Sequence, residues 1–78
     1  MNDQIRQILA EHARLPVAVD TLADDDDLFA AGMTSHASVS VMLALEDAFD
    51  QEFPDHMLKR SSFESIASIQ GCIEELAA

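Results

Sequence analysis

The chain has 78 residues, of which 15 are Asp or Glu and 4 are Lys or Arg, so its formal net charge at pH 7 is −11. This length predicts a single domain over residues 1–78, with a core too small to enclose a large substrate cavity. So few cations cannot neutralise a row of phosphates. Nucleic acid and anionic membrane are therefore excluded as partners, and basic proteins are expected.

The first predicted element is a helix over residues 3–14. Asn2 or Asp3 is available as its N-cap, and Pro16 ends it. Its apolar side chains recur at helical spacing: Ile5, Ile8, Leu9 and Ala13.

A long loop is predicted over residues 17–34, where no period holds and acidic residues and glycine favour turns. Loops of this length are uncommon inside compact domains unless they are pinned or functional. Four apolar residues can pin this one onto the core: Leu22, Leu28, Phe29 and Met33. We therefore expect an ordered loop, with a structural role for Asp27.

A second helix should begin at Thr34 or Ser35 and run to about Asp50. One face carries a core stripe, made of Val41, Met42, Leu45 and Phe49. A neighbouring face carries His36, Val39 and Leu43. The apolar surface is wider than one stripe, so this second face either widens the core contact or is exposed.

The last third of the chain predicts a short helix from Pro54 to Leu58, then a final helix after Ser61 or Ser62. Ser61 and Glu64 have the spacing of a capping box, and the final helix carries a strongly apolar face: Ile66, Ile69, Ile73 and Leu76. No segment shows the alternation of apolar and polar residues that is typical of a strand. The predicted fold is all-α, a small four-helix bundle with three longer helices, one short helix and a long first loop.

Catalytic and metal sites fit the sequence poorly. Ser35 and His36 are neighbours on a helix and point about 100° apart, which disfavours a hydrolytic dyad. The acidic run 24–27 lacks the glycine and the final acid of an EF-hand. Neither the histidines nor the cysteine have zinc-ligand spacing: His12, His36, His56 and Cys72. We expect no catalytic residue and no metal.

Ser35 remains as the candidate site. Taken alone, it is a helix N-cap. A phosphate ester at the same position would sit near unpaired backbone N–H groups and the positive end of the helix dipole, which makes this a favourable place for a phosphorylated group.

The segment 27–35, Asp-Leu-Phe-Ala-Ala-Gly-Met-Thr-Ser, resembles the serine segment of the acyl carrier protein family. Residues 41–50 and 52–55 resemble that family's second helix and the turn beyond, and residues 62–73 resemble its last helix. The resemblance implies that Ser35 carries 4′-phosphopantetheine, attached covalently from coenzyme A by a phosphopantetheinyl transferase. The thiol of that group would hold an acyl or aminoacyl cargo as a thioester, so the protein would be a carrier and not an enzyme.

Two departures from the family concern docking. Thr34-Ser35-His36 replaces the Asp-Ser-Leu of fatty acid carriers, and residues 37–40 carry no charge, so acids resume only at Glu46 and Asp47. We predict that partners dock on one stretch of the second helix, formed by His36, Val39, Leu43, Glu46 and Asp47. The neutral helix start is similar to that of carriers loaded with an amino acid by a synthetase-like ligase, and a downstream enzyme would accept the cargo.

A second function class stays open, in which the chain is a small helical interaction module and Ser35 is only a cap. Cys72 can form no internal disulfide, the start of the chain lacks the features of a signal peptide, and the longest apolar run, residues 41–45, is too short to span a membrane. We expect a cytoplasmic monomer.

Overall fold

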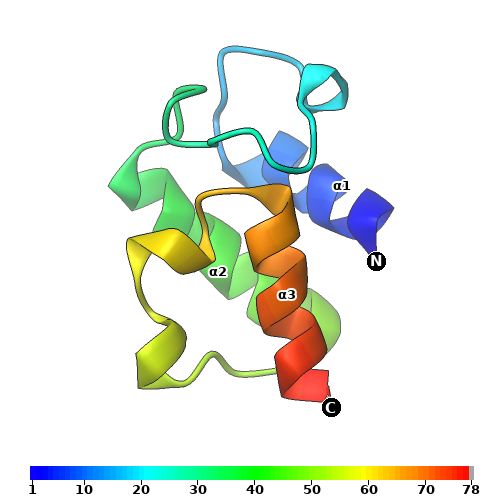
Figure 1. The fold of residues 1–78 in the computed structure, drawn as a ribbon, viewed down its shortest axis with the longest axis vertical. Coiled ribbons are helices and arrows are strands. Elements are labelled where there is room, and N and C mark those ends of the chain that lie inside the picture. The colour runs from blue at the N-terminus through cyan, green and yellow to red at the C-terminus, as the bar shows by residue number, and fades with distance from the viewer. Residues whose placement is uncertain (78) are drawn as a thin grey trace.

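The computed structural model describes residues 1–77, which form three α-helices joined by a long loop and short 3-10 turns (Figure 1). The described elements are α1 (Asn2–His12), η1 (Val19–Thr21), α2 (Ser35–Phe49), η2 (Asp55–Met57), η3 (Arg60–Ser62) and α3 (Ile66–Ala77). The all-α prediction is confirmed, and the predicted short fourth helix is the single turn η2.

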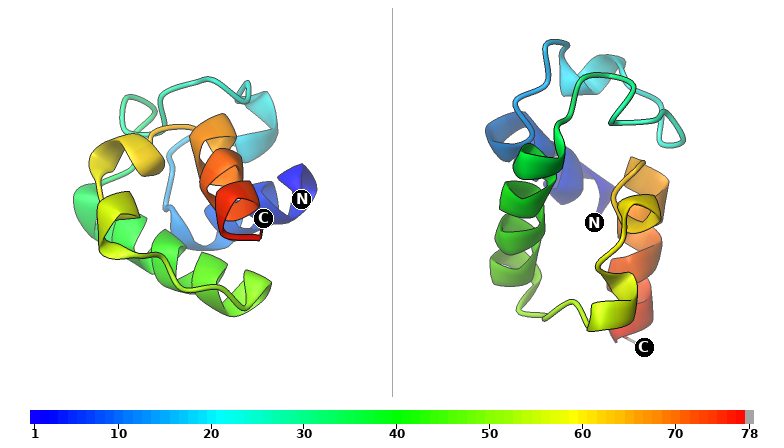
Figure 2. Two further views of the ribbon diagram at one scale, coloured as in Figure 1. Left: turned by 60° about the horizontal axis from the view of Figure 1, so that its bottom comes forward. Right: turned by 90° about the vertical axis from the view of Figure 1, so that its left-hand side faces the viewer.

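The core lies between the three helices, and α1 contacts both α2 and α3 (Figure 2). Each helix contributes the apolar stripe that its spacing predicts. The seven largest fully buried side chains are Ile5, Leu9, Leu28, Val41, Leu45, Ile66 and Ile69. Met42, Phe49 and Leu76 pack against this core from partly buried positions.

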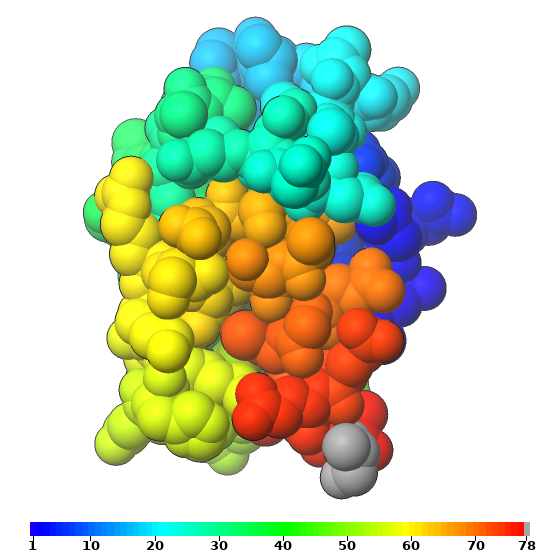
Figure 3. Space-filling view, viewed as in Figure 1, coloured from blue at the N-terminus to red at the C-terminus, as the bar shows by residue number. Residues whose placement is uncertain are grey.

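The loop between α1 and α2 covers one end of the molecule, against η3 and the start of α3 (Figure 3). Two backbone hydrogen bonds tie it to the start of α3: Leu28 N–H donates to Glu64 O at 2.7 Å, and Ala67 N–H donates to Asp24 O at 2.9 Å. Leu28 is fully buried. The loop is therefore ordered, as the pinning residues predict.

Helix α1 differs from its prediction at both ends. It starts at Asn2 after an N-cap at Met1 without a side-chain hydrogen bond, so neither Asn2 nor Asp3 is the cap. The Asn2 side chain instead donates to Asp24 Oδ1 at 2.9 Å. At the other end the helix stops at His12, because Arg14 turns into the left-handed region with φ +54°.

The capping box predicted for Ser61 and Glu64 is wrong. Ser61 lies within η3, and α3 begins at Ile66. Ser65 is the residue that caps this helix, since its Oγ accepts a hydrogen bond from Ser68 N–H at 3.0 Å. Ser61 and Ser65 offer the same side-chain chemistry, so the sequence pattern did not distinguish the serine that caps the helix from the one that does not.

None of the helices in residues 1–77 has the length and apolar character that would let it cross a lipid bilayer.

Candidate functional site

Ser35 is the first residue of α2 and is exposed. Thr34 precedes it with extended backbone angles, and Thr34 Oγ1 accepts a hydrogen bond from Ala37 N–H at 3.0 Å. The capping role considered for Ser35 therefore belongs to Thr34. Within residues 1–77 the Ser35 hydroxyl has no hydrogen-bond partner, which leaves its oxygen available for chemistry.

A compact turn over residues 27–33 leads into the serine. Asp27 Oδ1 accepts hydrogen bonds from Phe29 N–H at 2.9 Å and from Ala30 N–H at 3.2 Å. Met33 N–H closes the turn onto Leu28 O at 3.0 Å, and the Met33 side chain is buried. The structural role predicted for Asp27 is confirmed, and its carboxylate fixes the turn that positions Ser35.

The charge around Ser35 suits an anionic group. Ser35 lies at the positive end of a 15-residue helix whose first turn contains no acidic residue. A phosphate on this hydroxyl would be close to the first backbone N–H groups of α2 and would meet no carboxylate on that turn.

The helix face beside Ser35 is apolar and open to solvent. Val39 is 50% exposed and Leu43 is 56% exposed, while His36 is also exposed. The alternative that Val39 and Leu43 widen the core contact is therefore wrong. Val39 and Leu43 are four residues apart, so they are neighbours on this exposed helix face.

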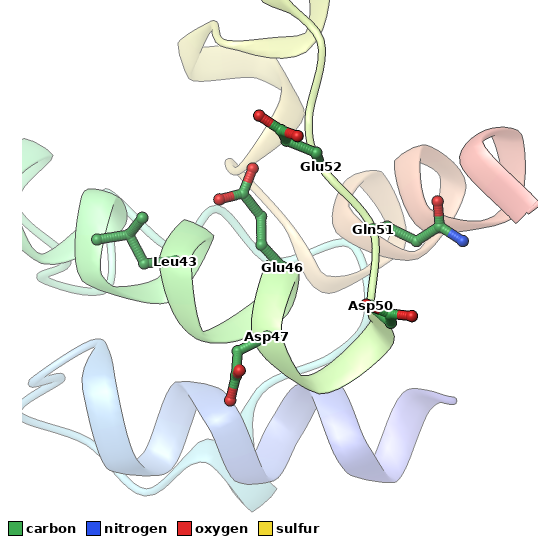
Figure 4. Close-up of a pocket in the computed structure, with 6 residues that line it drawn as sticks. All are labelled: Leu43, Glu46, Asp47, Asp50, Gln51 and Glu52. Carbon is green, nitrogen blue, oxygen red and sulfur yellow. The ribbon is translucent and has the colours of Figure 1, made fainter.

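The same helix ends in an acidic hollow of about 490 Å³, lined by Leu43, Glu46, Asp47, Asp50, Gln51 and Glu52 (Figure 4). Glu46 is half-buried and has a structural task, since its Oε2 accepts a hydrogen bond from Phe53 N–H at 2.9 Å. Figure 4 shows the Asp47 side chain pointing away from that of Glu46. The sequence did not predict that Asp50 and Glu52 line this hollow, because they reach it only through the turn at Asp50 (φ +52°).

The remaining candidate residues do not form a further site. His56 is exposed, whereas His12 and Cys72 are half-buried. Among residues 1–77, no three His, Cys, Asp or Glu side chains are grouped as a metal ion would require.

The sequence matches the phosphopantetheine attachment site family over residues 3–73. The chain belongs to this family. The resemblance to acyl carrier proteins is thereby confirmed: the protein is a carrier of 4′-phosphopantetheine and not itself a catalyst.

A curated relative, the aminoacyl carrier protein of Agrobacterium fabrum (strain C58 / ATCC 33970), is 54% identical over 74 residues, which are 95% of this chain and 89% of the relative. The carrier fold also matches a crystal structure of an engineered Bradyrhizobium japonicum glycine:[carrier protein] ligase with a carrier protein from Agrobacterium tumefaciens and AMP. That match has 54% identity and a TM-score of 0.93, and covers 95% of this chain and 99% of the other. A solution structure from Agrobacterium tumefaciens is 52% identical with a TM-score of 0.78, over 99% and 93% of the two chains.

The carrier's own residues fit the group that this family carries. The group is attached through a phosphate, and the structure offers an exposed hydroxyl at a helix N-terminus with no acid on the first turn. When attached, 4′-phosphopantetheine supplies a thiol that can hold an acyl group as a thioester.

Proposed function

We propose that Ser35 is the attachment site of 4′-phosphopantetheine and that the loaded cargo is an amino acid. The observation that supports this attachment site most directly is that Thr34 and Ser35 have different roles. Thr34 caps α2, and Ser35 Oγ is left exposed and free of partners among residues 1–77. A phosphopantetheinyl transferase would then form a phosphodiester at Ser35 from coenzyme A and release the nucleotide portion of the coenzyme.

The amino acid cargo is supported by similarity. The curated relative at 54% identity is an aminoacyl carrier protein, and the similar carrier chain was crystallised with a glycine:[carrier protein] ligase. We propose that a ligase of this class loads the carrier, and that a separate acceptor enzyme removes the cargo. Glycine is the first amino acid to test.

The docking surface that we propose on α2 has two parts. Next to Ser35 it offers the apolar side chains of Val39 and Leu43 with His36 at their edge. Its far end offers the exposed carboxylates of Asp47 and Asp50. From Val39 to Phe49, the last residue of α2, the helix rises about 15 Å, so a partner would place an apolar contact near the serine and its cations at the other end.

One mass measurement tests the attachment site. The carrier is co-expressed with a broad-specificity phosphopantetheinyl transferase, and its intact mass is expected to rise by one phosphopantetheine unit. The Ser35→Ala variant should gain nothing, while Ser38→Ala, which removes the next hydroxyl of the same helix turn, should gain the full unit. Modification of Ser35→Ala would overturn the assignment.

A second measurement tests the cargo. The modified carrier is incubated with ATP, glycine and a glycine:[carrier protein] ligase, and its mass is expected to rise by one glycyl group that hydroxylamine removes. If no amino acid in a panel is loaded while a fatty acyl group is, the aminoacyl assignment is wrong. If the wild-type chain accepts no phosphopantetheine from an active transferase, the interaction-module alternative is favoured.

A further inference from the structure

Two parts of the loop between α1 and α2 approach each other closely at Pro16 and Gly32, four residues after α1 ends and three residues before Ser35. A Cβ atom built on Gly32 would lie 2.6 Å from Pro16 Cδ and 2.9 Å from Pro16 Cγ. Carbon atoms in favourable contact are about 3.5–4.0 Å apart, so no larger residue fits here without movement. The backbone at Gly32 therefore approaches the proline ring as only glycine allows.

The backbone angle of Gly32 imposes a second, independent requirement. Its φ is +122°, a conformation that L side chains rarely adopt. The other glycine of the chain differs on both counts, since Gly71 lies within α3 and a Cβ built there meets nothing within 4 Å. Gly71→Ala is therefore a matched control for Gly32→Ala.

Backbone structure near each residue of the contact restricts its movement. Pro16 follows the turn in which Ala13 N–H donates to Leu9 O at 2.9 Å and Arg14 adopts its left-handed conformation. Gly32 belongs to the turn that precedes Ser35, and its N–H donates to Phe29 O at 3.1 Å. Gly32 is therefore part of a hydrogen-bonded turn, and Pro16 lies two residues after the left-handed Arg14, with a φ fixed by its own ring.

The contact is close to the serine but outside the core. Gly32 and Pro16 are both exposed, so little buried apolar area depends on them. Met33, the next residue, is buried and anchored, and Thr34 after it caps α2. A displacement of Gly32 would therefore strain the short connection through Met33 to the cap at Thr34 and to Ser35.

We propose that the Pro16–Gly32 contact positions Ser35 for modification. It holds the turn that leads into α2 against the first part of the loop after α1, and so sets how the serine hydroxyl is presented to the phosphopantetheinyl transferase. Neither residue takes part in the transfer itself. The inference rests on the proposed attachment at Ser35.

The test compares four variants with the wild type: Gly32→Ala, Pro16→Ala, the double variant, and Gly71→Ala as the control. The measurement is kcat/KM for transfer of phosphopantetheine from coenzyme A by a purified broad-specificity transferase, at a temperature where circular dichroism shows every variant folded. We expect Gly32→Ala to lower kcat/KM at least about tenfold, and Gly71→Ala to leave it unchanged. The double variant should recover part of the loss, because the ring atoms that the new Cβ meets are gone.

Hydrogen exchange separates local displacement from general destabilisation. The amide of Ala37 donates to Thr34 Oγ1 at 3.0 Å, and the amide of Ile69 donates to Ser65 O at 3.0 Å in α3. In Gly32→Ala, exchange at Ala37 should accelerate while exchange at Ile69 stays at the wild-type rate. A loss of global stability would accelerate both amides.

Three outcomes would overturn the proposal while the wild type is modified normally. The first is a wild-type modification rate in Gly32→Ala, and the second is a double variant that is no faster than Gly32→Ala. The third applies if Gly32→Ala does not fold. Modification of Pro16→Ala is then the test, and a wild-type modification rate in Pro16→Ala contradicts a positioning role. Failure of the wild type to be modified would instead contradict the assignment of Ser35.

Discussion

Arg6 and Asp24, 18 residues apart in sequence, form the contact that joins α1 to the acidic loop. Arg6 Nη2 donates to Asp24 Oδ1 at 2.7 Å, and Asn2 Nδ2 donates to the same oxygen at 2.9 Å. Arg6 Nη1 also donates to Val19 O at 2.9 Å. The Arg6 guanidinium therefore binds both the Asp24 carboxylate and the backbone of η1. The protein has only four Lys and Arg residues in total.

This contact makes stability depend on pH in the acid range. The hydrogen bonds from Asn2 and Arg6 lower the pKa of Asp24 below its usual value of 3.8. A carboxyl with a lowered pKa in the folded state stabilises the protein above the unfolded pKa, and this contribution is lost as pH falls through the folded pKa. The difference in urea midpoint between wild type and Asp24→Asn should thus be constant above about pH 5 and shrink below about pH 4. Asp25→Asn, which removes a neighbouring acid that receives none of these hydrogen bonds within residues 1–77, is the control.

The helix cap at Thr34 predicts a second stability effect. Thr34→Ala removes the acceptor for Ala37 N–H and should lower the free energy of unfolding by about 1 kcal/mol. Thr34→Ser keeps an acceptor oxygen and should retain most of that stability. Urea unfolding followed by circular dichroism measures both. Equal stability of the two variants would mean that the cap contributes nothing.

The apolar side of the docking surface predicts a loss of loading. Val39→Glu places a charge where we propose an apolar contact, and kcat/KM for loading by the ligase should fall at least about fivefold, equivalent to roughly 1 kcal/mol of contact energy. Leu58→Glu is the matched control, because Leu58 is 47% exposed and lies after η2, outside α2 and outside the turn that leads into Ser35. Unchanged loading of the Val39 variant would mean that the ligase does not use this face.

The acidic hollow predicts an effect on association rate. The double variant Asp47→Asn/Asp50→Asn should slow association with the ligase about two- to fivefold at low salt. The difference should fade above about 0.1 M salt, where the Debye length is about 10 Å. The double variant Asp20→Asn/Asp25→Asn removes the same two charges at exposed positions outside α2 and provides the control for net charge alone. If the double variant and this control behave alike, steering depends on total charge and not on the hollow.

The second glycine predicts a gain in stability. Gly71 lies inside α3 with open space where a side chain would be, so Gly71→Ala should raise the free energy of unfolding by about 0.5–1 kcal/mol. For a domain of this size, 1 kcal/mol corresponds to an increase of about 4–8 °C in Tm. Thermal unfolding by circular dichroism measures it. A lower Tm would show that flexibility at this position favours the fold.

The spacing of apolar residues was enough to predict the three long helices and most of their buried faces, because a helix's periodicity is a local property of the sequence. The start of α2 was predicted to one residue, since Thr34 and Ser35 are both good caps and stand directly before the periodic run. The start of α3 was predicted wrongly. Several serines precede that helix and each offers a capping oxygen, so the local pattern does not show that Ser65 is the cap.

The sequence by itself therefore determined the helical fold, the acidic character and, through its family resemblance, the carrier function and the candidate serine. The tertiary structure decided which neighbouring hydroxyl caps α2, that Val39 and Leu43 are exposed, and that Asp24 pairs with Arg6. It also decided the contact of Gly32 with Pro16. The physical reason is the same in each case: hydrogen bonds, burial and close packing between segments distant in the chain depend on how the helices pack, and local residue patterns do not encode them.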